Sequence, residues 1–161
     1  MASSLPTVTV ALVEMSDDER AMWLPRSWAN YEAERVRAGE TTEQAARVAS
    51  AQRGATFPGG RAATGHHVLH VVADDARVGW VWIGPSPGSE EGTLFLYEIE
   101  IDEPHRDVGL GSAAMRAAEE LARTLGASRL ALNVFGHNVR AKSLYDRIGY
   151  VTPATSMHKE L

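Results

Sequence analysis

The chain has 161 residues, of which 44% are hydrophobic and 23% charged, with a formal net charge of -5 and no cysteine. This length predicts one folded domain over residues 1–161, and the composition excludes a disordered or fibrous chain. The acidic balance disfavours nucleic-acid and membrane partners. Without cysteine there are no disulfides, thiolate metal sites or cysteine nucleophiles. The sequence has no secretory signal pattern and no run near the roughly 18 apolar residues of a membrane span, so we predict a cytoplasmic protein.

The first elements are predicted from alternation and capping signals. Residues 7–13 alternate and are rich in β-branched side chains, which predicts an opening strand. Ser16 has the spacing of a capping box with Glu19, so a helix should start at Ser16. This helix is expected to run to about Ala38, with a break or kink near Pro25, because proline lacks the amide that an interior turn requires.

A second helix and a hairpin are expected next. Thr41 repeats the capping pattern, which predicts a helix to about Arg53. Glycine and proline over residues 54–65 indicate a loop. The apolar runs 67–72 and 78–83 are separated by a short polar turn, and this arrangement predicts an antiparallel hairpin.

The second half of the chain predicts a strand, a turn, a helix, a strand and a helix. Residues 94–101 form the expected strand, and apolar residues at helical spacing predict a helix over 110–125. Further along, we expect a strand over 129–135, a short helix over 138–147 and a final strand near 157–161. The complete order predicts an α/β fold with helices on both faces of a sheet.

A glycine-rich turn joins the strand 94–101 to the following helix. Its sequence is Arg106-Asp107-Val108-Gly109-Leu110-Gly111-Ser112. Glycines let a backbone approach a ligand, and amides at a helix N-terminus bind anions, so the turn predicts a phosphate or pyrophosphate site. A tight turn with no ligand is the alternative. The dinucleotide-binding fingerprint lacks its third glycine here, and the Gly-Lys-Ser or Gly-Lys-Thr of a P-loop is absent.

Together with a second set of residues, this turn resembles the GNAT superfamily of acetyl-CoA-dependent N-acetyltransferases. The second set is Leu132-Asn133-Val134-Phe135-Gly136-His137-Asn138, Ala141, Leu144-Tyr145 and Ile148-Gly149-Tyr150. The resemblance implies a mixed, mostly antiparallel central sheet with a V-shaped splay between the fourth and fifth strands. It also implies acetyl-CoA as cosubstrate.

The resemblance assigns a coenzyme site residue by residue. The turn would bind the pyrophosphate through backbone amides, and the preceding strand would bind the pantetheine arm, with the Ile99 amide near the thioester oxygen. The implied residues are Ile99, Ile101, Arg106, Val108, Gly109, Leu110, Gly111, Ser112, Asn133, Asn138, Ala141 and Lys142. Arg140 and Lys142 would help neutralise phosphates, or form an ordinary solvated helix face. Relatives usually carry glycine and a basic residue where this chain has Asp107 and Val108, so we expect Asp107 to point outward and coenzyme binding to be weak.

Proton transfer is assigned to a tyrosine and two glutamates. By resemblance Tyr145 is the general acid that protonates the departing thiolate; a core aromatic is the alternative. Glu98 and Glu100 alternate on one face of an otherwise apolar strand, and their mutual repulsion would raise at least one pKa, so they predict a general base. A solvated strand face is the alternative. Some relatives use a glutamate on the fifth strand, but Asn133 at that position cannot take a proton.

The sequence gives fewer signals for the site that binds the acceptor substrate and for a metal site. Five aromatic residues either line an acceptor pocket or pack in the core: Trp23, Trp28, Tyr31, Trp80 and Trp82. The histidines at 66, 67 and 70 have no clustered carboxylate, and we predict no metal site. The sequence thus predicts direct acetyl transfer to a primary amine of a small molecule or protein. A non-catalytic acyl-CoA-binding or protein-interaction module is the alternative, and homodimerisation through terminal strands is plausible.

Overall fold

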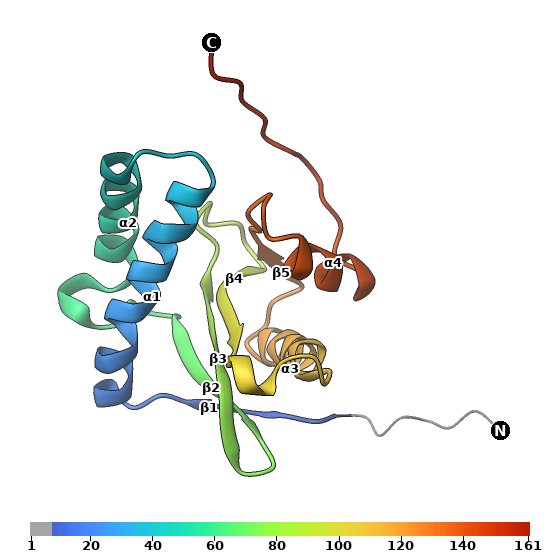
Figure 1. The fold of residues 1–161 in the computed structure, drawn as a ribbon. Coiled ribbons are helices and arrows are strands. Elements are labelled where there is room, and N and C mark those ends of the chain that lie inside the picture. The colour runs from blue at the N-terminus through green and yellow to red at the C-terminus, as the bar shows by residue number, and fades with distance from the viewer. Residues whose placement is uncertain (1–7) are drawn as a thin grey trace.

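The computed structural model describes residues 8–161, so the opening segment and Thr7, the first residue of the expected strand, lie outside the described residues (Figure 1). In chain order the elements are β1 (Ala11–Glu14), α1 (Asp17–Arg37), α2 (Thr42–Thr56), the 3-10 helix η1 (Pro58–Gly60), β2 (His67–Ala73), β3 (Ala76–Pro85), β4 (Thr93–Ile101), the 3-10 helix η2 (Glu103–His105), α3 (Leu110–Thr124), β5 (Arg129–Leu132) and α4 (Val139–Arg147). None of the described helices is long and apolar enough to cross a membrane.

Both capping boxes form at the predicted helix starts. The Ser16 hydroxyl accepts from the Glu19 amide at 3.2 Å, and the Glu19 carboxylate accepts from the Ser16 amide at 2.9 Å. Thr41 caps α2 in the same way. Helix α1 continues through Pro25 as one element, with buried side chains on both sides of the proline that pack against the sheet. Packing therefore holds the helix together where local propensity predicts a break.

The sheet order is β1-β2-β3-β4-β5, with β4 and β5 parallel and every other neighbouring pair antiparallel. The β2–β3 hairpin turns at Asp74 and Asp75, both with positive φ, as a two-residue hairpin turn requires. These features confirm the predicted mixed, mostly antiparallel sheet.

The sheet splits between β4 and β5. The two strands pair from Thr93 with Arg129 to Leu96 with Leu132, and β5 ends there instead of at the expected Phe135. β4 continues to Ile101 and stays paired with β3. At the point of divergence the β3–β4 register shifts, so that Tyr97 is an additional residue in β4. Such a bulge bends a strand and redirects its side chains, and here it marks the start of the predicted splay.

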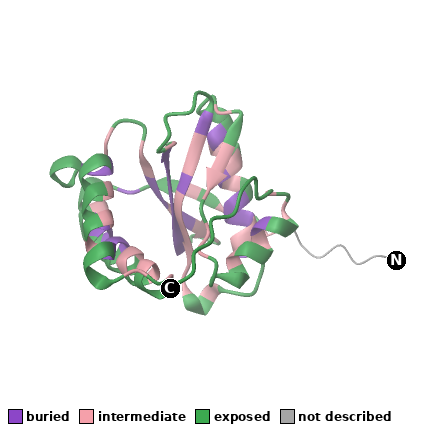
Figure 2. Cartoon of the chain, turned by 90° about the horizontal axis from the view of Figure 1, so that it is seen from above, coloured by how far each residue is buried: buried purple, intermediate pink, exposed green. Residues whose placement is uncertain are grey.

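Helices cover both faces of the sheet, as Figure 1 shows. On one face α1 and α2 pack over a cluster that contains Trp23, Trp28, Phe57 and Trp82. On the other face α3 and α4 pack over a cluster centred on the fully buried Met115. In Figure 2 the buried residues follow the sheet and the helix surfaces turned toward it. All four tryptophans are thus buried in the cluster beneath α1 and α2.

The prediction of a strand near residues 157–161 is wrong. Residues 148–161 form neither helix nor strand, and residues 151–161 are exposed throughout. Val151, Met157 and Leu161 are among the exposed large apolar side chains. A strand needs a neighbour for its backbone hydrogen bonds, and this segment leaves α4 away from the sheet (Figure 1).

A glycine in β3 allows the backbone of β4 to approach closely. A Cβ on Gly79 would overlap the carbonyl oxygen of Glu100 in β4. Gly79→Ala is therefore expected to lower the free energy of unfolding by about 1–3 kcal/mol, measured by urea denaturation. Gly54→Ala in α2 is the control, because its Cβ meets open space and should stabilise the helix by roughly 0.5–1 kcal/mol. Equal stability of both variants would contradict the close approach.

Candidate active site

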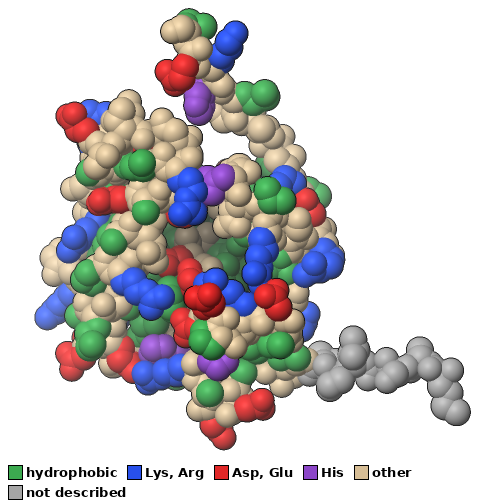
Figure 3. All heavy atoms as spheres, in the orientation of Figure 1, with side chains coloured by type: hydrophobic (Ala, Val, Ile, Leu, Met, Phe, Trp, Pro, Cys, Tyr) green, Lys and Arg blue, Asp and Glu red, His purple; other side chains and the backbone are tan. Residues whose placement is uncertain are grey.

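A cleft of about 980 Å³ opens where β4 and β5 diverge. Its walls come from α1, the free part of β4, the turn before α3, the segment after β5, and α4. Figure 3 shows the molecule hollowed at this place, with acidic and basic side chains around the opening. The splay thus brings together segments from both halves of the chain.

The Glu98 carboxylate is partly buried in this cleft and is held by two donors. The Ser27 hydroxyl of α1 donates to Oε2, and the Trp80 indole N–H of β3 donates to Oε1 at 2.9 Å. Burial raises the pKa of the Glu98 carboxyl above its usual range, and the hydrogen bonds from Ser27 and Trp80 oppose this shift. A carboxylate whose pKa is raised in this way is a better proton acceptor than an exposed one.

Glu100 also faces the cleft but forms an ion pair. Arg106 donates to Glu100 Oε1 at 2.9 Å and, through Nε, to the Ile101 carbonyl at 2.7 Å. Arg106 thereby links the start of the glycine turn to β4, and its positive charge compensates Glu100. The two glutamates that alternate in the sequence therefore have different surroundings: one is buried under neutral donors, and the other is neutralised by an arginine.

Beyond Leu96 the backbone of β4 directs groups that β5 does not pair with into the gap. The Glu100 carbonyl points toward β3, where it would meet a Cβ on Gly79, and the Asp102 amide donates to β3 at Val78. Because backbone groups point alternately to the two sides of a strand, the amides and carbonyls of Ile99 and Ile101 point the other way, into the splay. The Ile101 carbonyl accepts from Arg106 there, which leaves the Ile99 amide directed into the cleft.

The glycine turn leads into α3 with a left-handed residue. Gly109 is the N-cap of α3 at φ 86°, a conformation that favours glycine, and it lines the cleft with Gly111 and Ser112. Within the described residues, no side chain caps this helix start, so its first amides are directed outward. Val108 is exposed and Leu110 is buried in the core, and both lie outside the cleft lining.

Two ion pairs involve charged residues of the glycine turn and of α4. Asp107 is exposed but lines the cleft, where it accepts from Arg140 of α4 at 2.7 Å. Lys142 pairs with Asp146 at 2.7 Å and lies outside the cleft lining. Of the two basic residues considered for phosphate neutralisation, the structure thus brings Arg140 to the cleft, held by a carboxylate.

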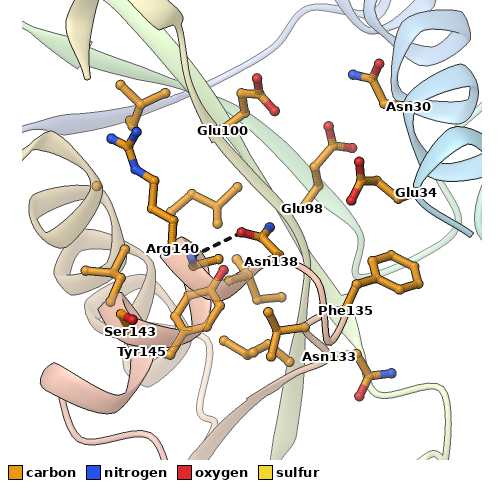
Figure 4. Close-up of a pocket in the computed structure, with 18 of the residues that line it drawn as sticks. Asn30, Glu34, Glu98, Glu100, Asn133, Phe135, Asn138, Arg140, Ser143 and Tyr145 are labelled. Atoms are coloured by element: carbon orange, nitrogen blue, oxygen red, sulfur yellow. Dashed lines mark hydrogen bonds between the residues drawn. The ribbon is translucent and has the colours of Figure 1, made fainter. Parts of the chain in front are cut away.

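Helix α4 contributes Asn138, Ala141 and Tyr145 to the opposite wall. The Asn138 side chain caps the helix by accepting from the Ala141 amide at 3.1 Å, the dashed contact in Figure 4. Tyr145 is 9% exposed and its hydroxyl is directed into the pocket, facing the side that carries Glu98 (Figure 4). Burial raises the pKa of the Tyr145 hydroxyl, so this group stays protonated at neutral pH and is able to donate a proton.

The sequence reasoning missed most of the α1 side of the cleft. Asn30, Glu34 and Arg37 line it together with Tyr31. Glu34 reaches across to His137, with 2.5 Å between Oε2 and Nε2. No local pattern could reveal these residues, because helical spacing marks them only as one polar face of α1. Two further cleft residues named as parts of a motif, Asn133 and Phe135, come from the segment after β5 (Figure 4).

The three neighbouring histidines are held separately. His66 accepts from the Trp82 indole at 3.1 Å, while His67 and His70 face Glu14 and Glu19, each at 3.4 Å. Among residues 8–161 there is no group of three histidine, aspartate or glutamate side chains arranged to hold a metal ion.

Comparison with known proteins agrees with this architecture. The model of the acetyltransferase (GNAT) family matches residues 20–150. The uncharacterized N-acetyltransferase YdgE of Bacillus subtilis (strain 168) is 33% identical over 152 residues, covering 93% of this chain and 97% of YdgE. The uncharacterized N-acetyltransferase YycN of the same organism is 30% identical over 156 residues, covering 96% and 100%.

Solved structures share the fold. The crystal structure of YycN matches with a TM-score of 0.85 over 95% of this chain and 99% of that chain. An aminoglycoside N-acetyltransferase in complex with CoA matches with a TM-score of 0.57 at 12% identity, covering 98% and 99%, and this likeness concerns the fold alone. The matched family and relatives place the chain among the acyltransferases. The chain belongs to the acetyltransferase (GNAT) family, and the predicted family, fold class and enzyme class are confirmed.

Proposed function

We propose that this enzyme transfers an acetyl group from acetyl-CoA directly to a primary amine of a small molecule or peptide. The observation that carries the proposal is the cleft itself: the partly buried Glu98 carboxylate and the Tyr145 hydroxyl line the same cavity, on opposite walls. An acceptor of a proton and a donor of a proton are the two groups that amide formation from a thioester requires. Family membership supports the assignment.

The surroundings fit acetyl-CoA as cosubstrate. The Gly109 turn offers backbone amides at the start of a 15-residue helix, a favourable place for a pyrophosphate. The free edge of β4 at Ile99 and Ile101 offers hydrogen-bonding groups for the pantetheine arm, and the Ile99 amide would stabilise negative charge on the thioester oxygen. Asn138 retains an amide N–H₂ for donation, since its oxygen caps α4.

The proposed reaction uses one proton-transferring group from each wall of the cleft, Glu98 and Tyr145. Glu98 takes a proton from the bound ammonium, directly or through water, and the freed nitrogen attacks the thioester carbonyl carbon. The carbon–sulfur bond then breaks, and Tyr145 donates its proton to the departing thiolate. The attacking nitrogen still carries one proton more than the amide, and it gives this proton to the Tyr145 phenolate, directly or through water. The products are a neutral amide and free coenzyme A, and Glu98 releases its proton to solvent. With no cysteine in the chain, direct transfer is the simplest route.

A non-catalytic acyl-CoA-binding module is the second candidate, and one observation favours it. The ion pair between Asp107 and Arg140 places a carboxylate at the glycine turn and occupies a nearby cation. A thiol-release assay with acetyl-CoA and a panel of primary amines distinguishes the two functions. An enzyme releases coenzyme A in the presence of at least one amine, whereas a binding module binds acetyl-CoA without turnover. The cytoplasmic location and the homodimer stay predictions.

Removing the charge of Asp107 is expected to strengthen coenzyme binding. In Asp107→Asn the anion disappears, Arg140 becomes available to a phosphate, and asparagine tolerates the positive φ of this residue. The Kd for coenzyme A should fall about threefold to tenfold at low ionic strength, and less at high salt. Calorimetric titration measures this change.

The matched control for this prediction is Asp146→Asn. Asp146 forms an ion pair of equal length with Lys142, outside the cleft lining, so its removal should leave the Kd unchanged. An unchanged Kd in Asp107→Asn would show that this carboxylate has no influence on the coenzyme.

A further inference from the structure

Ser27 is a polar residue at a buried helical position. The other buried positions of α1 are Trp23, Leu24 and Trp28, and Ser27 is 3% exposed. Serine forms helices less well than alanine, and burying a hydroxyl is unfavourable unless it has a partner. Its partner is the Glu98 carboxylate, 71 positions further along the chain. The contact with Glu98 therefore accounts for a serine where alanine would serve the helix and the core better.

Trp80 holds the other oxygen of the same carboxylate. Its indole N–H donates to Glu98 Oε1 at 2.9 Å, and the guanidinium of Arg26 lies 4.6 Å from the centre of its ring. By contrast, the buried indole nitrogens of Trp23 and Trp28 have no hydrogen-bond partner among residues 8–161. Burial of a tryptophan in this core thus does not by itself bring a partner, and the contact between Trp80 and Glu98 needs a separate explanation.

We propose that Ser27 and Trp80 are positioning residues that fix the orientation of the Glu98 carboxylate toward the acceptor amine. This inference rests on the proposed function. Each residue donates to a different oxygen. A carboxylate has about four acceptor sites, so both oxygens keep a lone pair for the incoming proton. Because the donors come from two different elements, α1 and β3, the carboxylate cannot rotate without breaking one contact.

The same two contacts adjust the protonation of the base. Burial raises the pKa of the Glu98 carboxyl, and both donors counteract this because a hydrogen bond to a carboxylate favours its charged form. Glu100 raises the pKa of Glu98 further, and Arg26 lowers it. The titratable and charged groups around the site come from every element of the cleft: Arg26, Tyr31, Glu34 and Arg37 from α1, Tyr97 and Glu100 from β4, Arg106 and Asp107 at the glycine turn, His137 after β5, and Arg140, Tyr145 and Arg147 from α4.

The test is the pH dependence of kcat/KM in Ser27→Ala, with Ser27→Thr as the conservative variant. Losing the hydroxyl should move the acidic limb of the profile about one pH unit higher. The rate at pH values below that limb should then fall about tenfold. KM for acetyl-CoA should stay within about twofold, since Ser27 acts through the base. Ser27→Thr keeps a hydroxyl and should restore the profile.

Matched controls separate this role from folding. Trp80→Phe should shift the limb in the same direction. Trp82→Phe removes a buried indole N–H from the same strand, but this N–H donates to His66, so the limb should not move. Ser50→Ala removes an exposed hydroxyl in α2 and should behave like the unmodified enzyme. Thermal unfolding of every variant reports its folding.

A second readout needs no turnover. In protein labelled with 13C at glutamate carboxyl groups, the Glu98 resonance is identified by its loss in Glu98→Gln, and its titration gives the pKa directly. A higher pKa in Ser27→Ala and Trp80→Phe, but not in Trp82→Phe, supports the inference. An unchanged pKa and an unchanged kinetic limb in both site variants overturn it, while thiol release by the unmodified enzyme leaves the proposed function standing. Absence of thiol release with every amine overturns the proposed function, and with it the role of Ser27 and Trp80 in catalysis.

Discussion

Tyr145→Phe is expected to lower kcat about 100-fold or more while the Kd for acetyl-CoA changes less than about threefold. Phenylalanine retains the ring in the core, where Tyr145 is 9% exposed, and removes only the hydroxyl. The thiolate would then depart without a positioned proton donor. Steady-state rates of thiol release, together with calorimetric titration of acetyl-CoA, measure both quantities.

Tyr150→Phe is the matched control for this substitution. Its ring lies 5.8 Å from that of Tyr145, centre to centre, in the same core, but Tyr150 lies outside the cleft lining. Its kcat should stay near that of the unmodified enzyme. Equal rates in Tyr145→Phe and in the unmodified enzyme would remove the general-acid role from Tyr145.

Glu98→Gln is expected to lower kcat/KM about 100-fold near neutral pH. Glutamine retains the shape, and its amide is able to accept from Trp80 and donate to Ser27, so the fold should persist. What disappears is the ability to accept a proton. Glu100→Gln is the control: Glu100 is paired with Arg106, and its loss should reduce the rate less than Glu98→Gln does. The reverse order would assign the base to Glu100.

The pH dependence of Glu98→Gln gives an independent check. In the unmodified enzyme kcat/KM should rise with pH as Glu98 loses its proton, and this rise should lie above the usual glutamate range because burial raises the pKa of Glu98. In Glu98→Gln this limb should vanish. The remaining rate should follow the fraction of uncharged acceptor amine, about tenfold per pH unit below the amine pKa.

Much of the fold could be predicted because its signals are local. A capping box spans four residues, so Ser16 and Thr41 identified two helix starts that the structure confirms. The left-handed N-cap at Gly109 agrees with a glycine-rich turn between a strand and a helix. The predicted final strand near Met157 is wrong for the complementary reason: a strand forms only where another strand lies within reach for pairing, and no local pattern shows this.

The candidate site likewise combines features that local sequence patterns indicate and features that depend on tertiary contacts. The sequence alone determined the family, the helix starts, the glycine turn and the candidate residues Glu98, Glu100 and Tyr145, because motif and periodicity are carried by neighbouring positions. Only the tertiary structure decided how the two glutamates differ. Glu98 accepts hydrogen bonds from Ser27 and Trp80, whereas Glu100 forms an ion pair with Arg106. It also joined pairs far apart in the chain, Asp107 with Arg140 and Glu34 with His137. The physical reason is that the protonation and orientation of a carboxylate depend on desolvation and on donors from other elements, which are defined only when the sheet and helices have packed.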